Sequence, residues 1–296
     1  MNTVSSQARC ITFIVVVWQA AASAQGPDLI PLLPAPTPAT HAIRLALLSG
    51  EADRATAAAD ALDPSARQLW LGILAIMRNN PNKAIRILRH TGEAKVLGVA
   101  YYVAGQYLLF RGQMAEAIRR NPDDFGPYYY LGRHYDTELD NPEEAAKWLR
   151  KALERNPGYA QAQSFLGSCL ERLGRTGEAE EAYRSSAALP RSQIGLARLR
   201  LAAGDSASAL AITEKALSAN PRDLAGQKLA ARIYAERDRP RDSLRALENA
   251  AKLAPREASI QYQIYRTCRS LGEHSKAANA LREFEHLRAV YGLQPQ

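Results

Sequence analysis

The stretch YLGRHYDTELDNPEEAAKWLRKALERNP, residues 130–157, decides the fold of this chain. Leu131 and Gly132 fall on one face of a first helix. A second helix begins at DNPEE, because Pro142 suits a first helical turn and the two glutamates that follow are favourable near a helix N-terminus. The second helix ends before Pro157, because the residue that precedes a proline is disfavoured in the helical conformation. The stretch therefore predicts two helices joined by a short turn.

The end of this stretch recurs along the chain. Close variants of KALERNP (151–157) occur as EAIRRNP (116–122), KALSANP (215–221) and NAAKLAP (249–255). Successive closing prolines are 35, 64 and 34 residues apart, and the middle interval is close to two units. This period predicts tandem helix pairs, each of which buries its open face only by stacking on its neighbours.

The composition agrees with a helical repeat array. The 296 residues are 47% hydrophobic but only 7% aromatic, so small and aliphatic residues supply most of the apolar content. Such a mixture favours helices with close contacts over sheets. Beyond residue 39 no segment alternates apolar and polar residues as a strand would. The sequence therefore predicts an all-α chain.

The repeats resemble the tetratricopeptide repeat family, whose unit is a helix–turn–helix of about 34 residues. The resemblance covers residues 40–292 and implies a right-handed α-solenoid of about eight helix pairs, in which the first helices line a concave groove that binds partner proteins. Its signature is Leu-Gly, then an aromatic residue, alanines and a closing proline. The matching positions are Leu97, Gly98, Tyr101, Ala117 and Pro122; Leu131, Gly132, Tyr135, Ala145, Ala152 and Pro157; Leu166, Gly167 and Ala179; Leu196, Ala197, Ala209 and Pro221; Leu247, Ala250 and Pro255; Gly272 and Ala277; and, in two degenerate units, Gly50 with Ala55 and Gly72 with Ala84.

The N-terminal region is a separate element. Residues 1–24 combine a lone basic residue, the apolar run CITFIVVVW and the small-residue triplet Ala22-Ser23-Ala24. This pattern predicts a signal peptide cleaved after Ala24, and hence export to the periplasm or the outside of the cell. An uncleaved membrane anchor is the alternative. A proline-rich linker is expected at 25–39, followed by the repeats at 40–292 and a short tail at 293–296.

The sequence holds no motif for catalysis. Phosphate-binding, serine-hydrolase and zinc-protease motifs do not occur, and the five histidines are never three or four residues apart. We therefore expect no enzymatic activity, metal or cofactor. Cys169 and Cys268 are expected to be small core residues without a disulfide. The net charge of +8 suggests nucleic acid as a partner, but export argues against it, so none is expected.

A basic ladder is predicted on the groove. Immediately after the glycine, or its equivalent, the last five units carry arginine four times and serine once. Arginine presents a planar fork of donors that suits carboxylates, so the groove is predicted to bind an acidic segment of a partner. An ordinary solvated face is the alternative. The predicted groove residues are Tyr129, Arg133, Arg198, Lys228, Arg232, Tyr262, Arg266 and Arg269.

The same positions are apolar in the second and third units. Either the proline-rich segment Leu29–Pro38 docks there, or the surface stays open for self-association or a partner helix. A third alternative is that the repeat register is shifted by one residue, which would make these residues ordinary core. The predicted apolar groove consists of Leu69, Ile73, Ile76, Met77, Val99, Tyr102 and Val103.

Together these patterns predict an exported interaction scaffold that binds a partner protein, with an acidic segment of the partner in the groove. The alternative is a non-catalytic accessory module of an envelope enzyme system, such as cell-wall or polysaccharide synthesis. In that case the reaction would be carried out by another chain.

Overall fold

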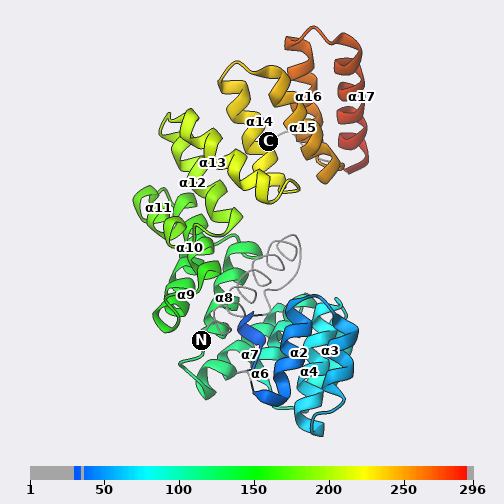
Figure 1. Cartoon of the computed structure of the whole chain (residues 1–296), viewed down its shortest axis with the longest axis vertical. Helices are drawn as coiled ribbons and strands as arrows, with labels where there is room; N and C mark the ends of the chain where they lie inside the picture. The colour runs from blue at the N-terminus through cyan, green and yellow to red at the C-terminus, as the bar shows by residue number, and fades with distance from the viewer. Residues whose placement is uncertain (1–29, 35–36, 292–296) are drawn as a thin grey trace, which may run out of the picture. The chain divides into compact units, whose positions relative to one another are not determined.

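The chain folds entirely into helices over the residues that a computed structural model describes, 30–34 and 37–291. These residues form 16 α-helices and one short 3-10 helix, η1, in the order shown in Figure 1. Consecutive helices pack against each other in adjacent pairs, as the repeat pattern predicts. The chain divides into two compact units, the first ending at Arg175 and the second beginning at Thr176.

Unit 1 contains four helix pairs followed by one further helix. The pairs are α2 with α3, α4 with α5, α6 with α7 and α8 with α9, while α10 packs on α9. The bounds are η1 Ile30–Leu32, α2 Pro38–Leu48, α3 Ala52–Ala59, α4 Pro64–Met77, α5 Pro81–Leu88, α6 Ala94–Val103, α7 Tyr107–Arg120, α8 Phe125–Thr137, α9 Pro142–Arg155 and α10 Ala160–Arg172.

Unit 2 begins with a single helix, α11, that packs on α12 and is followed by three pairs. The pairs are α12 with α13, α14 with α15 and α16 with α17. The bounds are α11 Thr176–Ser185, α12 Pro190–Ala202, α13 Ser206–Ala219, α14 Leu224–Glu236, α15 Pro240–Leu253, α16 Ala258–Ser270 and α17 His274–Tyr291.

The helix boundaries predicted around DNPEE are confirmed. Helix α9 begins at Pro142, and the side chain of Asn141 accepts a hydrogen bond of 3.0 Å from the backbone N–H of Glu144. This cap satisfies one of the N–H groups that a helix start leaves without an intrahelical partner. The helix ends at Arg155, with Asn156 as its C-cap, directly before Pro157. The short polar turn therefore determines where the second helix of the pair begins.

Glycines in the first helices set the distance between the helices of a pair. A Cβ atom added at Gly72, Gly98 or Gly132 would lie 2.4, 2.3 or 2.7 Å from a side-chain atom of the second helix. The atoms met belong to Leu88, Met114 and Leu149, respectively. All three glycines therefore face the second helix in the same way. The glycines of the degenerate early units therefore take the same place against the second helix as Gly132 does in the pair α8–α9.

The two cysteines of the repeats are core residues, as predicted. Cys169 on α10 and Cys268 on α16 are free and fully buried. Burial, with the nearby Asp136 carboxylate, raises the pKa of the Cys169 thiol to about 12, so the thiol stays protonated at neutral pH. Cys268 packs with Ile264, Leu244 and Leu247 in the core of α14–α17. Both side chains therefore serve as small apolar residues.

Candidate partner-binding site

Three arginines recur at the same position of successive first helices in unit 2. Arg198 on α12, Arg232 on α14 and Arg266 on α16 are each 34 residues from the next. Arg232 and Arg266 are exposed, whereas Arg198 is half-buried. The guanidinium of Arg198 donates a hydrogen bond of 3.2 Å to the Tyr183 hydroxyl. The repeat thus places one cation on each first helix of this unit.

Arg232 has an acidic neighbour on its own helix. Its Nε donates to Glu236 at 2.9 Å, and side-chain exposures of 69% and 43% make this an exposed ion pair. Exposed pairs of this kind contribute about 0–1 kcal/mol, because water and salt screen them and the side chains lose freedom. A carboxylate from another molecule can therefore replace Glu236 at little cost.

Helix α16 adds aromatic surface beside its arginine. Tyr262 is 42% exposed, and its ring centroid lies 5.2 Å from that of Phe284 on α17. One turn further on, Arg269 donates a hydrogen bond of 3.1 Å to the hydroxyl of Tyr265. Tyr262 is one helical turn before Arg266, so this end of unit 2 presents an aromatic ring together with cations. Such mixed surfaces are typical of protein-binding sites.

Three other predicted groove residues serve within the fold. Lys228 of α14 pairs with Glu257, the N-cap residue of α16, at 2.5 Å, so it joins two repeats of unit 2. The guanidinium of Arg133 lies 5.0 Å from the ring centroid of Phe165. Tyr129 is fully buried, with Tyr159 at a ring-centroid distance of 5.1 Å. The expectation that Tyr129 lines an open groove is wrong, because residues of the following repeat cover it.

The predicted apolar groove is also less open than expected. Ile73, Ile76 and Val99 have exposures of 0%, 1% and 0%, so they are not a free surface. The other four predicted residues of this groove are partly exposed: Leu69, Met77, Tyr102 and Val103.

Sequence reasoning missed an aromatic cluster where α6, α7 and α8 meet. His134 is 1% exposed, and the rings of Tyr107 and Phe110 lie 5.1 and 5.2 Å from it. Tyr107 and Tyr102 both donate hydrogen bonds to Glu138, at 2.6 and 3.1 Å. The bond to Glu138 raises the pKa of Tyr107 to about 12, and burial lowers the pKa of His134. Phe110, found where an alanine is usual, was the one visible signal of this cluster.

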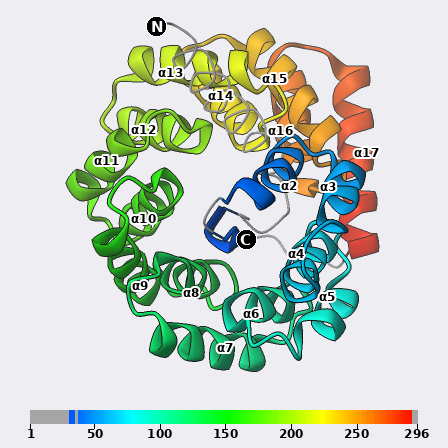
Figure 2. The same ribbon diagram turned by 60° about the horizontal axis from the view of Figure 1, so that its bottom comes forward.

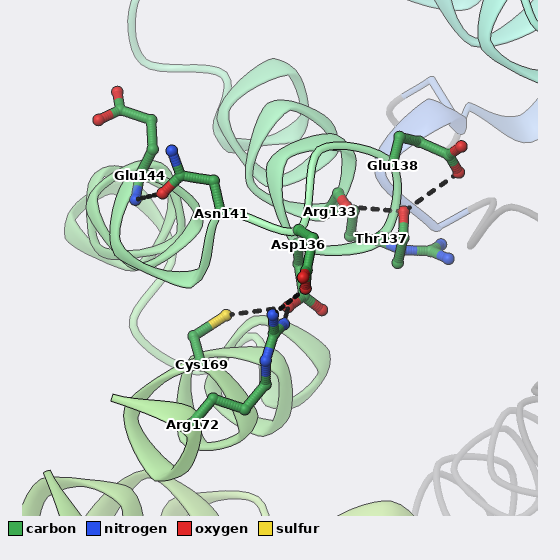
Figure 3. Close-up of polar contacts among 9 residues, drawn as sticks. Arg133, Asp136, Thr137, Glu138, Asn141, Glu144, Cys169 and Arg172 are labelled. Atoms are coloured by element: carbon green, nitrogen blue, oxygen red, sulfur yellow. Dashed lines mark hydrogen bonds and ion pairs between the residues drawn. The ribbon is translucent and has the colours of Figure 1, made fainter. Parts of the chain in front are cut away.

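The last turn of α8 carries a second polar network, shown in Figure 3. Asp136 accepts from Arg172 of α10 at 2.6 Å and from the Cys169 thiol at 3.5 Å. Thr137 donates to the carbonyl of Arg133 at 2.9 Å. Asp136 is therefore occupied in joining α8 to α10.

Neither metal ligation nor membrane crossing has a basis in the described part of the chain. Among residues 30–34 and 37–291, no three histidine, cysteine or acidic side chains converge as metal ligands would. Within the same residues, each helix is too short or too polar to traverse a bilayer.

Comparison with known proteins supports the repeat assignment. A sequence model of the tetratricopeptide repeat family matches residues 95–160 and 134–193. No curated protein matches the sequence. The matched region, residues 95–193, has the sequence of tetratricopeptide repeats, and proteins with these repeats bind protein or peptide partners.

Solved structures share the fold at low sequence identity. The Cut9–Hcn1 hetero-tetramer of APC/C aligns with a TM-score of 0.67 and 17% identity, covering 83% of this chain and 52% of that one. PilF of Pseudomonas aeruginosa aligns with a TM-score of 0.59 and 18% identity, covering 68% and 91%. PilW, a type IV pilus biogenesis factor, gives 0.58 and 19%, covering 69% and 96%. At these identities the likeness shows a shared all-helical solenoid and nothing finer.

Proposed function

We propose that this chain is an exported, non-catalytic scaffold whose unit 2 binds an acidic segment of a partner protein. The observation that carries the proposal is the recurrence of Arg198, Arg232 and Arg266 at one position of α12, α14 and α16. Each guanidinium offers a fork of N–H donors that matches a carboxylate. An extended acidic segment would meet one such fork per repeat.

The surroundings of these arginines favour an acidic partner over a neutral one. Arg266 is exposed, and the carboxylate beside Arg232 forms only an exposed pair that exchanges readily. Tyr262 and Arg269 extend the same end of unit 2 with an aromatic ring and a further cation. Charge would therefore guide the encounter, and the aromatic ring would add contact area.

Export is the second part of the proposal. It rests on the apolar run and the Ala22-Ser23-Ala24 triplet, which lie outside the described residues. We expect the mature protein in the periplasm or outside the cell, beginning at Gln25. Mass spectrometry of the N-terminal peptide from the purified native protein tests this. A chain that retains residues 1–24 in the membrane fraction would show that the segment is an anchor instead.

Charge reversal tests the binding site. The probe is a fluorescein-labelled deca-glutamate peptide followed by anisotropy, with a glycine–serine peptide as the neutral reference. We expect Arg232→Glu with Arg266→Glu to weaken binding by at least about tenfold. The two guanidinium groups are then replaced by carboxylates, which repel the glutamates of the probe. Binding by the unchanged chain should also weaken as salt rises, because charges further apart than about 8 Å are screened at physiological ionic strength.

The matched control keeps the same change in net charge on the second helices. Lys215→Glu on α13 with Arg241→Glu on α15 alters two exposed residues in the same unit. This variant should bind the peptide about as well as the unchanged chain. Equal losses in both variants would mean that only total charge matters, and the arginines would then be an ordinary solvated face. Circular dichroism should show the same helix content in all three proteins.

A further inference from the structure

We infer that the inner side of unit 1 is a second binding groove, specific for a leucine- and proline-containing segment, and that Ile30–Pro34 of this chain occupies it. The groove differs from the arginine site of unit 2 in both place and chemistry. It therefore does not depend on the proposed binding of acidic segments.

The segment is buried far more deeply than a linker of this kind would be on an open surface. Leu32 and Leu33 have exposures of 1% and 9%, and Pro31 is buried as well. Ile30–Leu32 forms the short helix η1, and the N–H of Leu33 donates to the carbonyl of Ile30 at 3.2 Å. Fully burying a leucine contributes roughly 1.5–3 kcal/mol. Two leucines thus hold the segment in place.

Contacts at its two ends show which helices the segment spans. The carbonyl oxygen of Pro31 lies 3.1 Å from where a Cβ atom on Gly126 of α8 would be. The carbonyl of Pro34 accepts a hydrogen bond of 2.8 Å from Arg44 of α2. The segment therefore runs between the first helices of the fourth and the first pair. Figure 2 shows η1 on the inner side of α2, α4, α6 and α8.

The contact with α8 is close at Gly126, where an added Cβ atom would be tightly placed. Besides the Pro31 carbonyl, a Cβ there would meet Asp124 and Lys95, each at 3.1 Å. Asp124 and Lys95 form a half-buried ion pair of 2.6 Å that joins α6 to the start of α8. The Lys95–Asp124 ion pair and Gly126 together form the end of the proposed groove at α8.

Equivalent positions in the two units indicate what the segment does. Ile73 and Val99 follow the helix-facing glycines of α4 and α6, just as Arg133 follows Gly132 on α8. The positions of Arg232 and Arg266 in unit 2 are exposed, whereas Ile73 and Val99 are fully buried. Within this proposal, the segment adds to the burial that the packing of α4 on α6 already provides. The apolar residues of unit 1 suit an apolar segment, just as the arginines of unit 2 suit an acidic segment.

Because the segment is tethered directly before α2, its effective concentration at the groove is on the order of millimolar. A free copy of the same peptide would therefore compete poorly while the tethered copy is in place. Once the tethered copy is disabled, the groove should accept the free one. This gives a test in which binding appears upon mutation instead of disappearing.

The test uses the full-length chain with Leu32→Asp and Leu33→Asp. The probe is a fluorescein-labelled peptide of residues 26–37, GPDLIPLLPAPT, followed by anisotropy. We expect the variant to bind the peptide at least about tenfold more tightly than the unchanged chain does. The same peptide with aspartate in place of Leu32 and Leu33 should not bind. Leu32→Ala with Leu33→Ala serves as a milder variant in case the aspartates prevent folding.

The matched control alters two exposed leucines of the same unit. Leu108 and Leu109 on α7 are 76% and 49% exposed, so Leu108→Asp with Leu109→Asp should leave the groove filled and the peptide unbound. Two results would overturn the inference. One is that neither variant of Leu32 and Leu33 binds the peptide while retaining helix content. The other is that the unchanged chain binds the peptide as tightly as the variants do.

Discussion

At the scale of single residues, the short distance between the two helices of a pair depends on glycines in the first helix. Gly132 on α8 faces Leu149 so directly that an added Cβ would lie 2.7 Å from the leucine side chain and 3.2 Å from its backbone nitrogen. Real Cβ atoms do not approach other atoms so closely, so the second helix would have to move. Gly112 on the exposed side of α7 has open space around its Cβ position. The two glycines therefore have different roles.

Replacing each glycine by alanine should change stability in opposite directions. We expect Gly132→Ala to lower the free energy of unfolding by about 1–3 kcal/mol, because overpacking forces the helices apart. Gly112→Ala should raise it by about 0.5–1 kcal/mol, because alanine restricts the unfolded chain and suits a helix interior. Urea denaturation followed by circular dichroism measures both. Equal effects of the two substitutions would show that the close approach at Gly132 is not limiting.

Residue types and spacing predicted position better than they predicted exposure. The pattern placed Gly72, Gly98 and Gly132 correctly against their second helices, because spacing within a pair is a local property. Tyr129 and Ile73 occupy the expected helices but are buried, and Tyr129 is covered by residues of the next repeat. Whether such a side chain is buried depends on elements that are distant in the sequence. A repeat pattern contains no information about such elements.

At the scale of helices, contacts between pairs are more specialised than contacts within them. The pair α6–α7 meets α8 through His134, with the rings of Tyr102, Tyr107 and Phe110 around it. Burial is the main cause of the lowered pKa of His134, Arg111 lowers it further, and Glu138 opposes the shift. The histidine is therefore neutral in the folded chain at pH 7. As pH falls, the unfolded chain takes up a proton at this histidine before the folded chain does.

The stability of this junction should depend on pH. Since the folded pKa of His134 lies below its unfolded value of about 6.5, the unfolded chain binds more protons between the two values. The stabilisation is complete above the unfolded pKa and is lost as pH falls through this window. We expect His134→Phe to make the free energy of unfolding less sensitive to pH between 7.5 and 5. The measurement is urea denaturation at a series of pH values.

The control for this experiment is His90→Gln, which changes an exposed histidine of unit 1. Its pH dependence should follow that of the unchanged chain. If His134→Phe also follows the unchanged chain, the histidine is not responsible for any loss of stability in acid.

Helix starts were predictable, whereas the histidine junction was not. Asn141 and Pro142 mark the beginning of α9 through local backbone chemistry, which the sequence displays directly. His134, Tyr107 and Phe110 come from two helices and meet only because the pairs stack at a particular angle. That angle is a result of packing along the whole interface. Phe110 could be recognised as unusual, but its neighbours could not be predicted.

At the scale of the whole molecule, the two units consist of the same type of repeat and differ in their inner surfaces. The first helices of unit 1 carry buried apolar residues such as Ile73 and Val99, whereas Arg232 and Arg266 on the first helices of unit 2 are exposed. In a repeat protein each pair contacts mainly its neighbours, so stability is approximately a sum of local contributions. A change in one unit should have little effect on distant repeats.

Native-state hydrogen exchange tests this locality. We expect Gly132→Ala to increase amide exchange in α8, α9 and the helices that pack on them, while α16 and α17 keep their protection. The expectation follows from nearest-neighbour stabilisation, in which local openings need not involve the entire chain. A uniform increase from α2 to α17 would instead show that the chain unfolds as one cooperative body. Gly112→Ala provides the reference with no loss of packing.

The position of η1 also has a consequence for the order of events during folding. Helix pairs form from residues close together in sequence and should assemble quickly, whereas Pro31 must wait for Gly126, which lies beyond three intervening helix pairs. The groove does not exist until α8 has joined the stack. On a chain that is still being synthesised, we therefore expect the segment Ile30–Pro34 to remain undocked and accessible. Its docking would be one of the last steps in the folding of unit 1.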